Sequence, residues 1–188
     1  MVMAFVITVL IVLLIIMLWA MFTNNSLIAK RNRVRQCRSG ICVAIKQRND
    51  MIPNLISAVK AYMVHENETL TRIAELRSQS LFDSERQQID DGNEISSLLS
   101  RLNVAVENYP ALKADGQFME LQRSIIDMEC ELQAIRRTYN AAVTDYNNCI
   151  EMFPSSIFAS WRNFQEEELI EIPPENMRDI NVAQMFEK

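Results

Sequence analysis

The first 22 residues, MVMAFVITVLIVLLIIMLWAMF, contain no charged side chain. As a helix, such a segment is about 30 Å long, which matches the hydrocarbon core of a bilayer. A cleaved signal peptide would need a basic start, a shorter apolar stretch and small residues at a cleavage site, and this segment meets none of these requirements. We therefore predict a transmembrane anchor over residues 1–24. The residues expected to face lipid include Val2, Phe5, Leu10, Leu14, Trp19 and Phe22.

The charges are distributed unevenly along the chain. No Asp or Glu precedes Asp50, whereas seven Lys and Arg residues lie between positions 30 and 48. The other 12 basic residues are outnumbered by 24 acidic ones, so the body lacks the basic surface of a nucleic-acid-binding protein. Because Lys and Arg accumulate on the cytoplasmic side of a span, we expect the N-terminus outside and the body in the cytoplasm. Contacts with lipid headgroups are expected from Lys30, Arg31, Arg33 and Arg35.

Helical periodicity dominates the chain after residue 26. From Phe118 to Cys149, apolar residues recur at alternating spacings of three and four over about five heptads. Long helices joined by short connections must pack antiparallel to bury such stripes. The predicted fold is all-α: an antiparallel bundle of four main helices over 25–164, preceded by the transmembrane helix and followed by an extended acidic and apolar tail over 165–188. The core seam is predicted to comprise Phe118, Leu121, Ile125, Met128, Leu132 and Ile135.

Helix boundaries follow from local signals. Gly40 is a weak point where the first helix of the body is expected to kink or to thin on one side. Asn49-Asp50 predicts a new helix start, with Pro53 in the first turn, where its missing N–H costs little. Apolar spacing then predicts a single helix that continues through Glu66 to Leu76. The polar stretch 81–93 is expected to be a linker before a third helix over 95–109.

Several motifs occur in one order along the chain. They are NSLIAKRNRV, QRNDMIPNLISAVKAYMVHENETLTRIAELRS, NYPALKADGQFMELQ and RRTYNAAVTDYNNCIEMFPSSIFA. Together they resemble the bacterial LemA family over roughly residues 25 to 160. The resemblance implies a single-pass protein of the bacterial inner (cytoplasmic) membrane, a helical bundle and no assigned enzymatic activity. It also implies a membrane partner such as a metalloprotease or a TPM-domain protein, and the family includes a magnetosome-membrane protein.

The first candidate site is His65-Glu66, which contains the chain's only histidine. Acid–base chemistry needs a partner within hydrogen-bond reach, and the sequence supplies no matched nucleophile or second histidine. Neighbouring side chains on a helix also point about 100° apart and cannot form a unit by themselves. We interpret the pair as part of a polar clasp between helices, with ligand binding, pH sensing and catalysis as alternatives. The predicted clasp comprises His65, Glu66, Arg136, Tyr139, Asn140 and Tyr146.

The second candidate site is a repeat of Tyr-Asn pairs, Tyr139-Asn140 and Tyr146-Asn147, one heptad apart. Such a ladder can bind a ligand, but a packed tyrosine whose hydroxyl is hydrogen-bonded is the commoner arrangement. No metal or cofactor site is expected, because the four cysteines form no CxxC pair and only one histidine is present. The cysteines are expected to be unpaired structural thiols.

Three functions remain open from the sequence. The first is a membrane-anchored, non-enzymatic scaffold or assembly protein that associates with itself as a homo-oligomer. The second is an adaptor or regulator of a membrane protease or another membrane complex, and it rests on family analogy alone. The third is a bundle that senses a small ligand bound between its helices. An enzyme is not expected, since the sequence contains no Walker, GxGxxG, GxSxG or HExxH motif.

Overall fold

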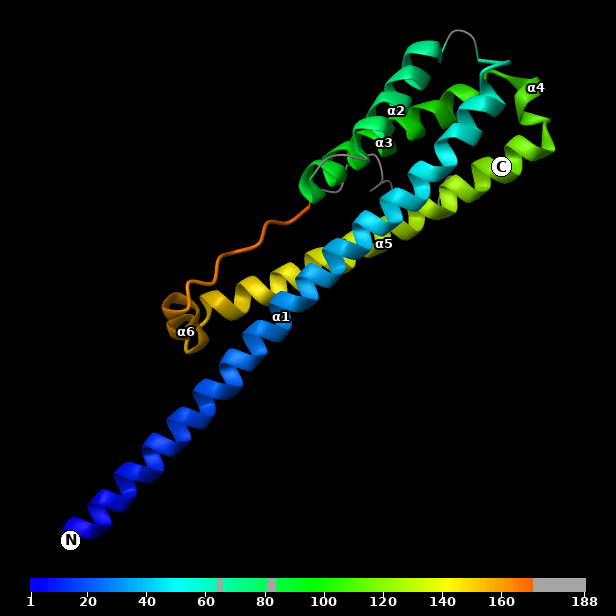
Figure 1. Ribbon diagram of the computed structural model, residues 1–188. Coiled ribbons are helices and arrows are strands. Elements are labelled where there is room, and N and C mark those ends of the chain that lie inside the picture. Colours follow the sequence, from blue (N-terminus) through cyan, green and yellow to red (C-terminus); the bar gives the residue numbers. More distant parts are fainter. Residues whose placement is uncertain (64–65, 81–83, 171–188) are drawn as a thin grey trace, which may run out of the picture. The chain divides into compact units, whose positions relative to one another are not determined.

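A computed structural model describes residues 1–63, 66–80 and 84–170 of the chain. The described residues form helices and no strand, so the predicted all-α class is confirmed (Figure 1). The helices are α1 (Val2–Val59), α2 (Asn67–Gln79), α3 (Glu85–Val106), α4 (Pro110–Lys113), α5 (Gly116–Glu151) and α6 (Ser155–Trp161).

Polar caps and a proline define several of the helix ends. The Ser84 hydroxyl accepts a hydrogen bond from the Gln87 N–H at the start of α3. Asp115 accepts the N–H groups of Gln117 and Phe118 at 2.9 and 3.0 Å, and so caps α5. These bonds satisfy backbone donors that have no partner within the helix. Pro110 lies at the first position of α4, where its missing N–H costs nothing.

The described residues divide into two compact units, and the long helices α1 and α5 contribute to both. The first unit combines residues 1–38 with 137–170, and the second contains residues 39–136. We describe the two units separately. The first holds the apolar part of α1, the C-terminal part of α5, and α6, while the second holds the main hydrophobic core.

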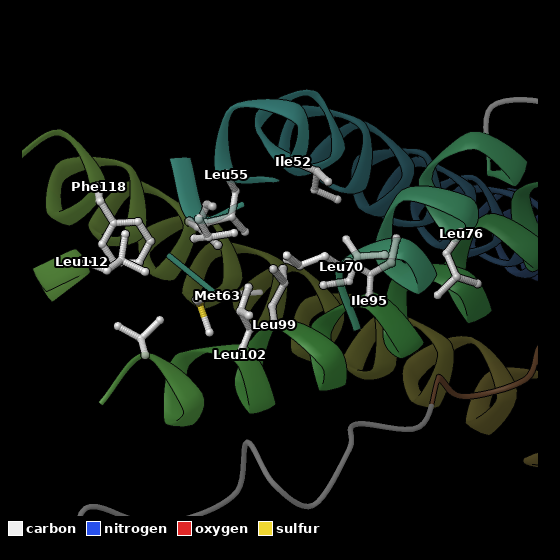
Figure 2. Packing of buried hydrophobic residues seen from close by; sticks show 14 residues of the cluster. Ile52, Leu55, Met63, Leu70, Leu76, Ile95, Leu99, Leu102, Leu112 and Phe118 are labelled. Carbon is white, nitrogen blue, oxygen red and sulfur yellow. The ribbon is translucent and has the colours of Figure 1, made fainter. Parts of the chain in front are cut away.

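The core of the second unit lies between the C-terminal part of α1, α2, α3, α4 and the start of α5 (Figure 2). Consecutive long helices run in alternating directions, which confirms the predicted antiparallel bundle of four main helices (Figure 1). Each helix therefore buries its apolar face against its neighbours. The core residues labelled in Figure 2 are Ile52, Leu55, Met63, Leu70, Leu76, Ile95, Leu99, Leu102, Leu112 and Phe118.

The first unit contains the predicted anchor. In the part of the chain that the structure describes, α1 is the helix long and apolar enough to cross a membrane. All side chains from Val2 to Phe22 except Ala20 are exposed, so the protein itself covers little of this apolar surface. Burial begins at Leu27 and recurs at Val34 in this unit. The same helix thus passes from a fully exposed apolar segment into a packed segment.

The predicted helix start at Asn49-Asp50 is wrong, and α1 continues as one helix through Gly40 and Pro53. Proline cannot donate the backbone bond that would normally reach the Asn49 carbonyl, four residues earlier. Arg77 on α2 donates instead, with 2.8 Å from its Nε to the Asn49 oxygen. A tertiary contact therefore satisfies the group that proline leaves free.

Two other predicted boundaries also differ from the structure. The helix predicted to pass through Glu66 ends at Val59, and α2 begins only at Asn67. Residues 85–93, predicted to lie in a linker, belong to α3, where Gly92 is buried. A Cβ at position 92 would lie 2.8 Å from Ile45 Cδ1, so the glycine permits close packing of α3 on α1. The polar stretch that suggested a linker thus contains a site of close helix packing.

The predicted seam on α5 divides into two levels of burial. Phe118, Ile125 and Leu132, one heptad apart, are at most 4% exposed. Leu121, Met128 and Ile135, which lie between them, are only half-buried. The spacing of seven continues into the first unit with Tyr139 and Tyr146, each 1% exposed. This stripe brings two tyrosines to the inner face of α5.

Candidate functional site

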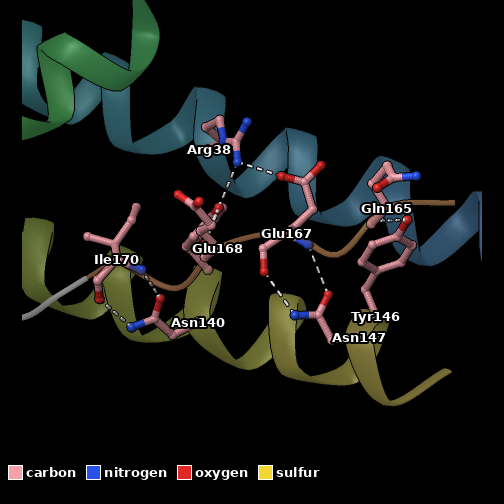
Figure 3. Close-up of polar contacts among 9 residues, drawn as sticks. Arg38, Asn140, Tyr146, Asn147, Gln165, Glu167, Glu168 and Ile170 are labelled. Carbon is pink, nitrogen blue, oxygen red and sulfur yellow. Dashed lines mark hydrogen bonds and ion pairs between the residues drawn. The ribbon is translucent and has the colours of Figure 1, made fainter. Parts of the chain in front are cut away.

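The predicted Tyr-Asn repeat on α5 lies along an extended segment of the same chain, residues 165–170 (Figure 3). This segment follows α6 and has no regular secondary structure. Four side chains of α5 form hydrogen bonds with its backbone. We call them the Tyr-Asn ladder: Tyr139, Asn140, Tyr146 and Asn147.

Each asparagine of the ladder binds one residue of the segment through two hydrogen bonds. The Asn147 amide donates to the Glu167 carbonyl at 2.8 Å and accepts the Glu167 N–H at 3.1 Å. Asn140 forms the same pair of bonds with Ile170, both at 2.9 Å. An amide side chain carries a donor and an acceptor side by side, and so matches the N–H and C=O of one residue. The asparagines thus act as the neighbouring strand would in a sheet.

Each tyrosine adds one bond to a carbonyl. The Tyr146 hydroxyl donates to the Gln165 oxygen at 2.9 Å, and the Tyr139 hydroxyl donates to the Glu168 oxygen at 3.0 Å. Both rings are buried, and burial raises the pKa of Tyr146. All six bonds reach backbone atoms, so the ladder recognises an extended main chain and does not depend on the segment's side chains.

The spacing of the ladder matches the geometry of an extended chain. Tyr139 and Tyr146 bind residues three apart, and so do Asn140 and Asn147. Seven residues of a helix rise about 10.5 Å. Three residues of an extended chain span about 10 Å. A repeat at heptad spacing on a helix can therefore hold every third residue of an extended segment in register.

One ion pair adds side-chain specificity to the ladder. Arg38 on α1 donates to the Glu167 carboxylate at 2.6 Å and to the Tyr139 hydroxyl at 2.9 Å. Its guanidinium carbon also lies 5.7 Å from the centre of the Tyr139 ring. Burial acts to lower the pKa of Arg38, but the hydrogen bond to Tyr139 and the attraction of Glu167 outweigh it, so this pKa is raised. Sequence reasoning missed Arg38, which it placed in no candidate site.

The residues of the predicted polar clasp are divided between the two units, and each part is described by itself. His65 lies outside the described residues. Glu66 is half-buried just before α2 and makes no side-chain cap bond there. Tyr139, Asn140 and Tyr146 bind the segment 165–170. The clasp assumed that one helix carries Glu66 along the bundle, and the end of α1 at Val59 removes that premise.

Arg136 belongs to a buried cluster in the second unit. Arg48 is fully buried and paired with Glu129 at 2.9 Å. It also donates to the Gly92 carbonyl and the Ser96 hydroxyl. Arg136 is equally buried, yet none of its guanidinium nitrogens has a hydrogen-bond partner in the described part of the chain.

The electrostatics of this cluster follow from burial. Desolvation lowers the pKa of Arg48, although the attraction of Glu129 opposes it. For Arg136 desolvation is again the main cause and lowers the pKa to about 10, with Glu129 raising it and Arg48 lowering it further. Two buried guanidinium groups thus share one carboxylate, an arrangement that costs stability rather than adding to it.

The basic residues predicted to contact headgroups lie on α1 just beyond the apolar segment. Arg33 and Arg35 are exposed, whereas Lys30 and Arg31 are half-buried. The Arg31 guanidinium lies 5.6 Å from the centre of the Phe164 ring, so this residue also packs against the chain after α6. None of the four cysteines forms a disulfide within the described residues.

A comparison with protein families decides the classification of the chain. A family model described as the LemA family matches residues 38–183. The chain belongs to the LemA family. The resemblance found from the sequence motifs is therefore confirmed.

Individual relatives support the LemA classification. The chain is 29% identical to Protein LemA of Metamycoplasma hominis over 148 residues, which are 78% of this chain and 64% of that protein. It is 22% identical to the magnetosome protein MamQ of Magnetospirillum gryphiswaldense over 87% of this chain and 70% of that protein. It is also 29% identical to the magnetosome protein MamQ 2 of Paramagnetospirillum magneticum over 48% of this chain and 33% of that protein.

The chain thus spans from a third to about two-thirds of the length of these relatives. Their names include a magnetosome protein, and the described part of this chain carries one exposed apolar helix. Together these observations indicate a membrane-associated helical protein of the LemA family.

Proposed function

We propose that this LemA-family chain is a membrane-anchored, non-enzymatic assembly protein that associates with copies of itself. The observation that carries the proposal is the continuity of α1, a single helix from an exposed apolar segment to the buried core residues Ile52 and Leu55. The apolar segment and packed residues of the body thus belong to one helix, and no segment outside that helix connects them. Such a body offers the outer faces of its helices for contacts parallel to the membrane. The body lies on the cytoplasmic side in this proposal, because the basic residues follow the span.

Co-purification of two differently tagged copies tests self-association. Both copies are expressed in one bacterial cell, extracted in mild detergent and purified through one tag. Recovery of the second tag supports the proposal. A control protein with the span of residues 1–24 and an unrelated body should not be recovered. Recovery of only the captured copy, or equal recovery of the control, would contradict self-association through the body.

A second candidate function is an adaptor that binds an extended segment of a membrane-protein partner. The observation that favours it is the Tyr-Asn ladder, whose six hydrogen bonds all reach backbone atoms. A partner's extended segment offers the same backbone groups and could replace residues 165–170. A glutamate two positions after the start of that segment would also meet Arg38, as Glu167 does.

A peptide-binding measurement tests the adaptor proposal. Glu167→Pro together with Ile170→Pro removes the two N–H groups that the asparagines accept, and should release the chain's own segment. A fluorescent peptide with the sequence QEEELI should then bind this full-length variant and be lost when Asn140 and Asn147 are also replaced by alanine. No binding to the proline variant, or binding that survives the alanine substitutions, would contradict a ladder that accepts peptides.

A further inference from the structure

The first unit carries a second exposed apolar surface besides the span. It lies at the end of α5 and on α6, and we call it the α6 surface. Its side chains are large and strongly exposed: Met152 is 60%, Phe153 81%, Ile157 58% and Trp161 78% exposed. Exposed apolar groups clustered in this way mark a surface that is covered in the working protein.

The α6 surface combines one face of a short helix with the turn before it. Ile157 and Trp161 are four residues apart on α6, so they lie on the same side of the helix, and Phe153 lies in the turn that precedes it. Ala159 on α6 is buried and Phe158 is half-buried, so the other side of the helix packs against the unit. α6 is therefore held in place by its inner side while its outer side presents Ile157 and Trp161.

The inner side of α6 contacts the transmembrane segment itself. The rings of Phe158 and Trp19 lie edge to face with centroids 5.3 Å apart. Trp19 lies three residues before Phe22, the last residue of the apolar run, which is about 4.5 Å along the helix axis. Lys30, the first charged residue, lies about 16 Å beyond Trp19. The contact thus places α6 beside the end of the span, at the level where a bilayer changes from hydrocarbon to headgroups.

The aromatic and basic composition fits this level. Trp and Tyr are enriched at membrane–water interfaces because one part of each ring system is apolar and another is polar. Phe158 also contacts Trp161, with ring centroids 6.4 Å apart. Arg162, which directly follows α6, and Arg33 on α1 belong to the same unit and are exposed, so both can meet anionic headgroups. Glu151, which precedes the surface, is also exposed.

We propose that Met152, Phe153, Ile157 and Trp161 insert into the interfacial layer of the leaflet where α1 leaves the membrane. α6 is then a second membrane contact, and the occupant of its exposed face is lipid. The pair of contacts fixes the rotation of α1 about its axis and the tilt of the first unit, which a single span leaves free. This inference rests on the membrane anchoring in the proposed function.

Fluorescence quenching in vesicles tests the proposal, because the chain contains only Trp19 and Trp161. The full-length protein is reconstituted into phosphatidylcholine–phosphatidylglycerol vesicles as two variants, Trp19→Phe and Trp161→Phe. Each variant reports on one tryptophan. Lipids brominated near the headgroup should quench most of the Trp161 emission, and acrylamide in the water should quench little of it.

Two outcomes would overturn the proposal. Strong acrylamide quenching of Trp161 without lipid quenching would place the α6 surface in water. Protection from both quenchers would mean that protein covers it. In either case, lipid quenching of Trp19 in the other variant would show that the span is still in the bilayer, so the anchoring would stand. Absence of lipid quenching at Trp19 would instead contradict the anchoring itself.

A matched pair of substitutions adds a second readout. Ile157→Asp places a charge in the α6 surface and should reduce the lipid quenching of Trp161 several-fold while leaving that of Trp19 unchanged. Val104→Asp on α3 is the matched control, because Val104 is 71% exposed and Ile157 58%. Val104 lies in the second unit, whereas the α6 surface belongs to the first. This control substitution should leave both signals as they are. An Ile157→Asp variant with unaltered Trp161 quenching would count against insertion.

Discussion

Arg77 donates a 2.8 Å hydrogen bond from its Nε to the backbone oxygen of Asn49. That oxygen is the acceptor that the residue at position 53 would serve in an uninterrupted helix, and position 53 is proline. The Asn49 side chain is also used, since its amide donates to the Ser80 hydroxyl at 3.0 Å. A proline inside α1 and an arginine on α2 are therefore coupled through one carbonyl.

This coupling predicts a non-additive effect on stability. Arg77→Ala should lower the free energy of unfolding by about 1–3 kcal/mol, because it leaves a buried carbonyl without a partner. In a Pro53→Ala background the backbone N–H at position 53 can bind the same oxygen, so the loss should fall by at least half. Denaturant unfolding followed by circular dichroism measures both values.

Arg72 on the same helix provides the control for this cycle. It is exposed and pairs with Glu94 at 2.8 Å, so Arg72→Ala should cost much less stability than Arg77→Ala. That cost should be the same with proline or alanine at position 53. Equal losses for Arg77→Ala in the two backgrounds would show that Arg77 does not compensate for the proline.

The Tyr-Asn ladder predicts residue-specific protection of two amides. The N–H groups of Glu167 and Ile170 should exchange slowly with solvent, because each is bound by an asparagine. Asn147→Ala should speed exchange chiefly at Glu167, and Asn140→Ala chiefly at Ile170. Asn148→Ala, which changes an exposed neighbour, should alter neither amide. Hydrogen exchange resolved by residue measures this, and fast exchange of both amides in the wild type would contradict the ladder.

The unpartnered guanidinium of Arg136 predicts that its removal stabilises the protein. Arg136→Met keeps much of the side-chain volume and should raise the free energy of unfolding by about 1–3 kcal/mol. Arg48→Met should do the opposite by about 3–5 kcal/mol, because it leaves Glu129 unpaired. Thermal unfolding of the two variants checks the contrast. Destabilisation by Arg136→Met would show that this group has a favourable role in the fold.

The pH dependence of Arg136 follows from the sign of its pKa shift. Burial lowers the pKa of Arg136 in the folded state to about 10, well below the ordinary value that the group keeps in the unfolded chain. The unfolded state therefore binds more protons between these values, and stability rises with pH through this window. The advantage of Arg136→Met should be full below about pH 9 and should shrink as the pH rises to about 11. An advantage that stays constant over this range would exclude burial of the charge as its cause.

Topology is tested with a native thiol. Cys130 is exposed on α5 and free, so a maleimide that cannot cross membranes will report its side. With the body in the cytoplasm, Cys130 should label only after the cells are opened. Cys130→Ser identifies the contribution of the other three cysteines. Labelling of Cys130 in intact cells would place the body outside.

The sequence was sufficient where a local pattern decides the structure. The heptad spacing from Phe118 to Cys149 predicts a single helix, and α5 runs from Gly116 to Glu151. The uncharged first 22 residues predict an exposed apolar helix, and the structure contains one. In both cases the pattern extends over many turns, so tertiary contacts cannot easily override it.

The sequence was insufficient where a distant group completes the structure. Pro53 signals a helix start, and only the contact with Arg77 on α2 explains how α1 continues through it. Spacings of three and four continue through Glu66, yet the helix ends at Val59. The Tyr-Asn repeat is visible as a heptad pattern, but its partner is main chain at 165–170, which carries no side-chain signal. The sequence can therefore suggest a ladder on α5, but it cannot identify the backbone segment that the ladder binds.

The mass of the full-length protein in detergent tests self-association most directly. Light scattering coupled to size exclusion, corrected for bound detergent, gives the protein mass of the particle. We predict one discrete species at a multiple of the 21.7 kDa chain mass, and the same multiple after dilution. A particle that contains a single chain at every protein concentration would contradict the proposed assembly function.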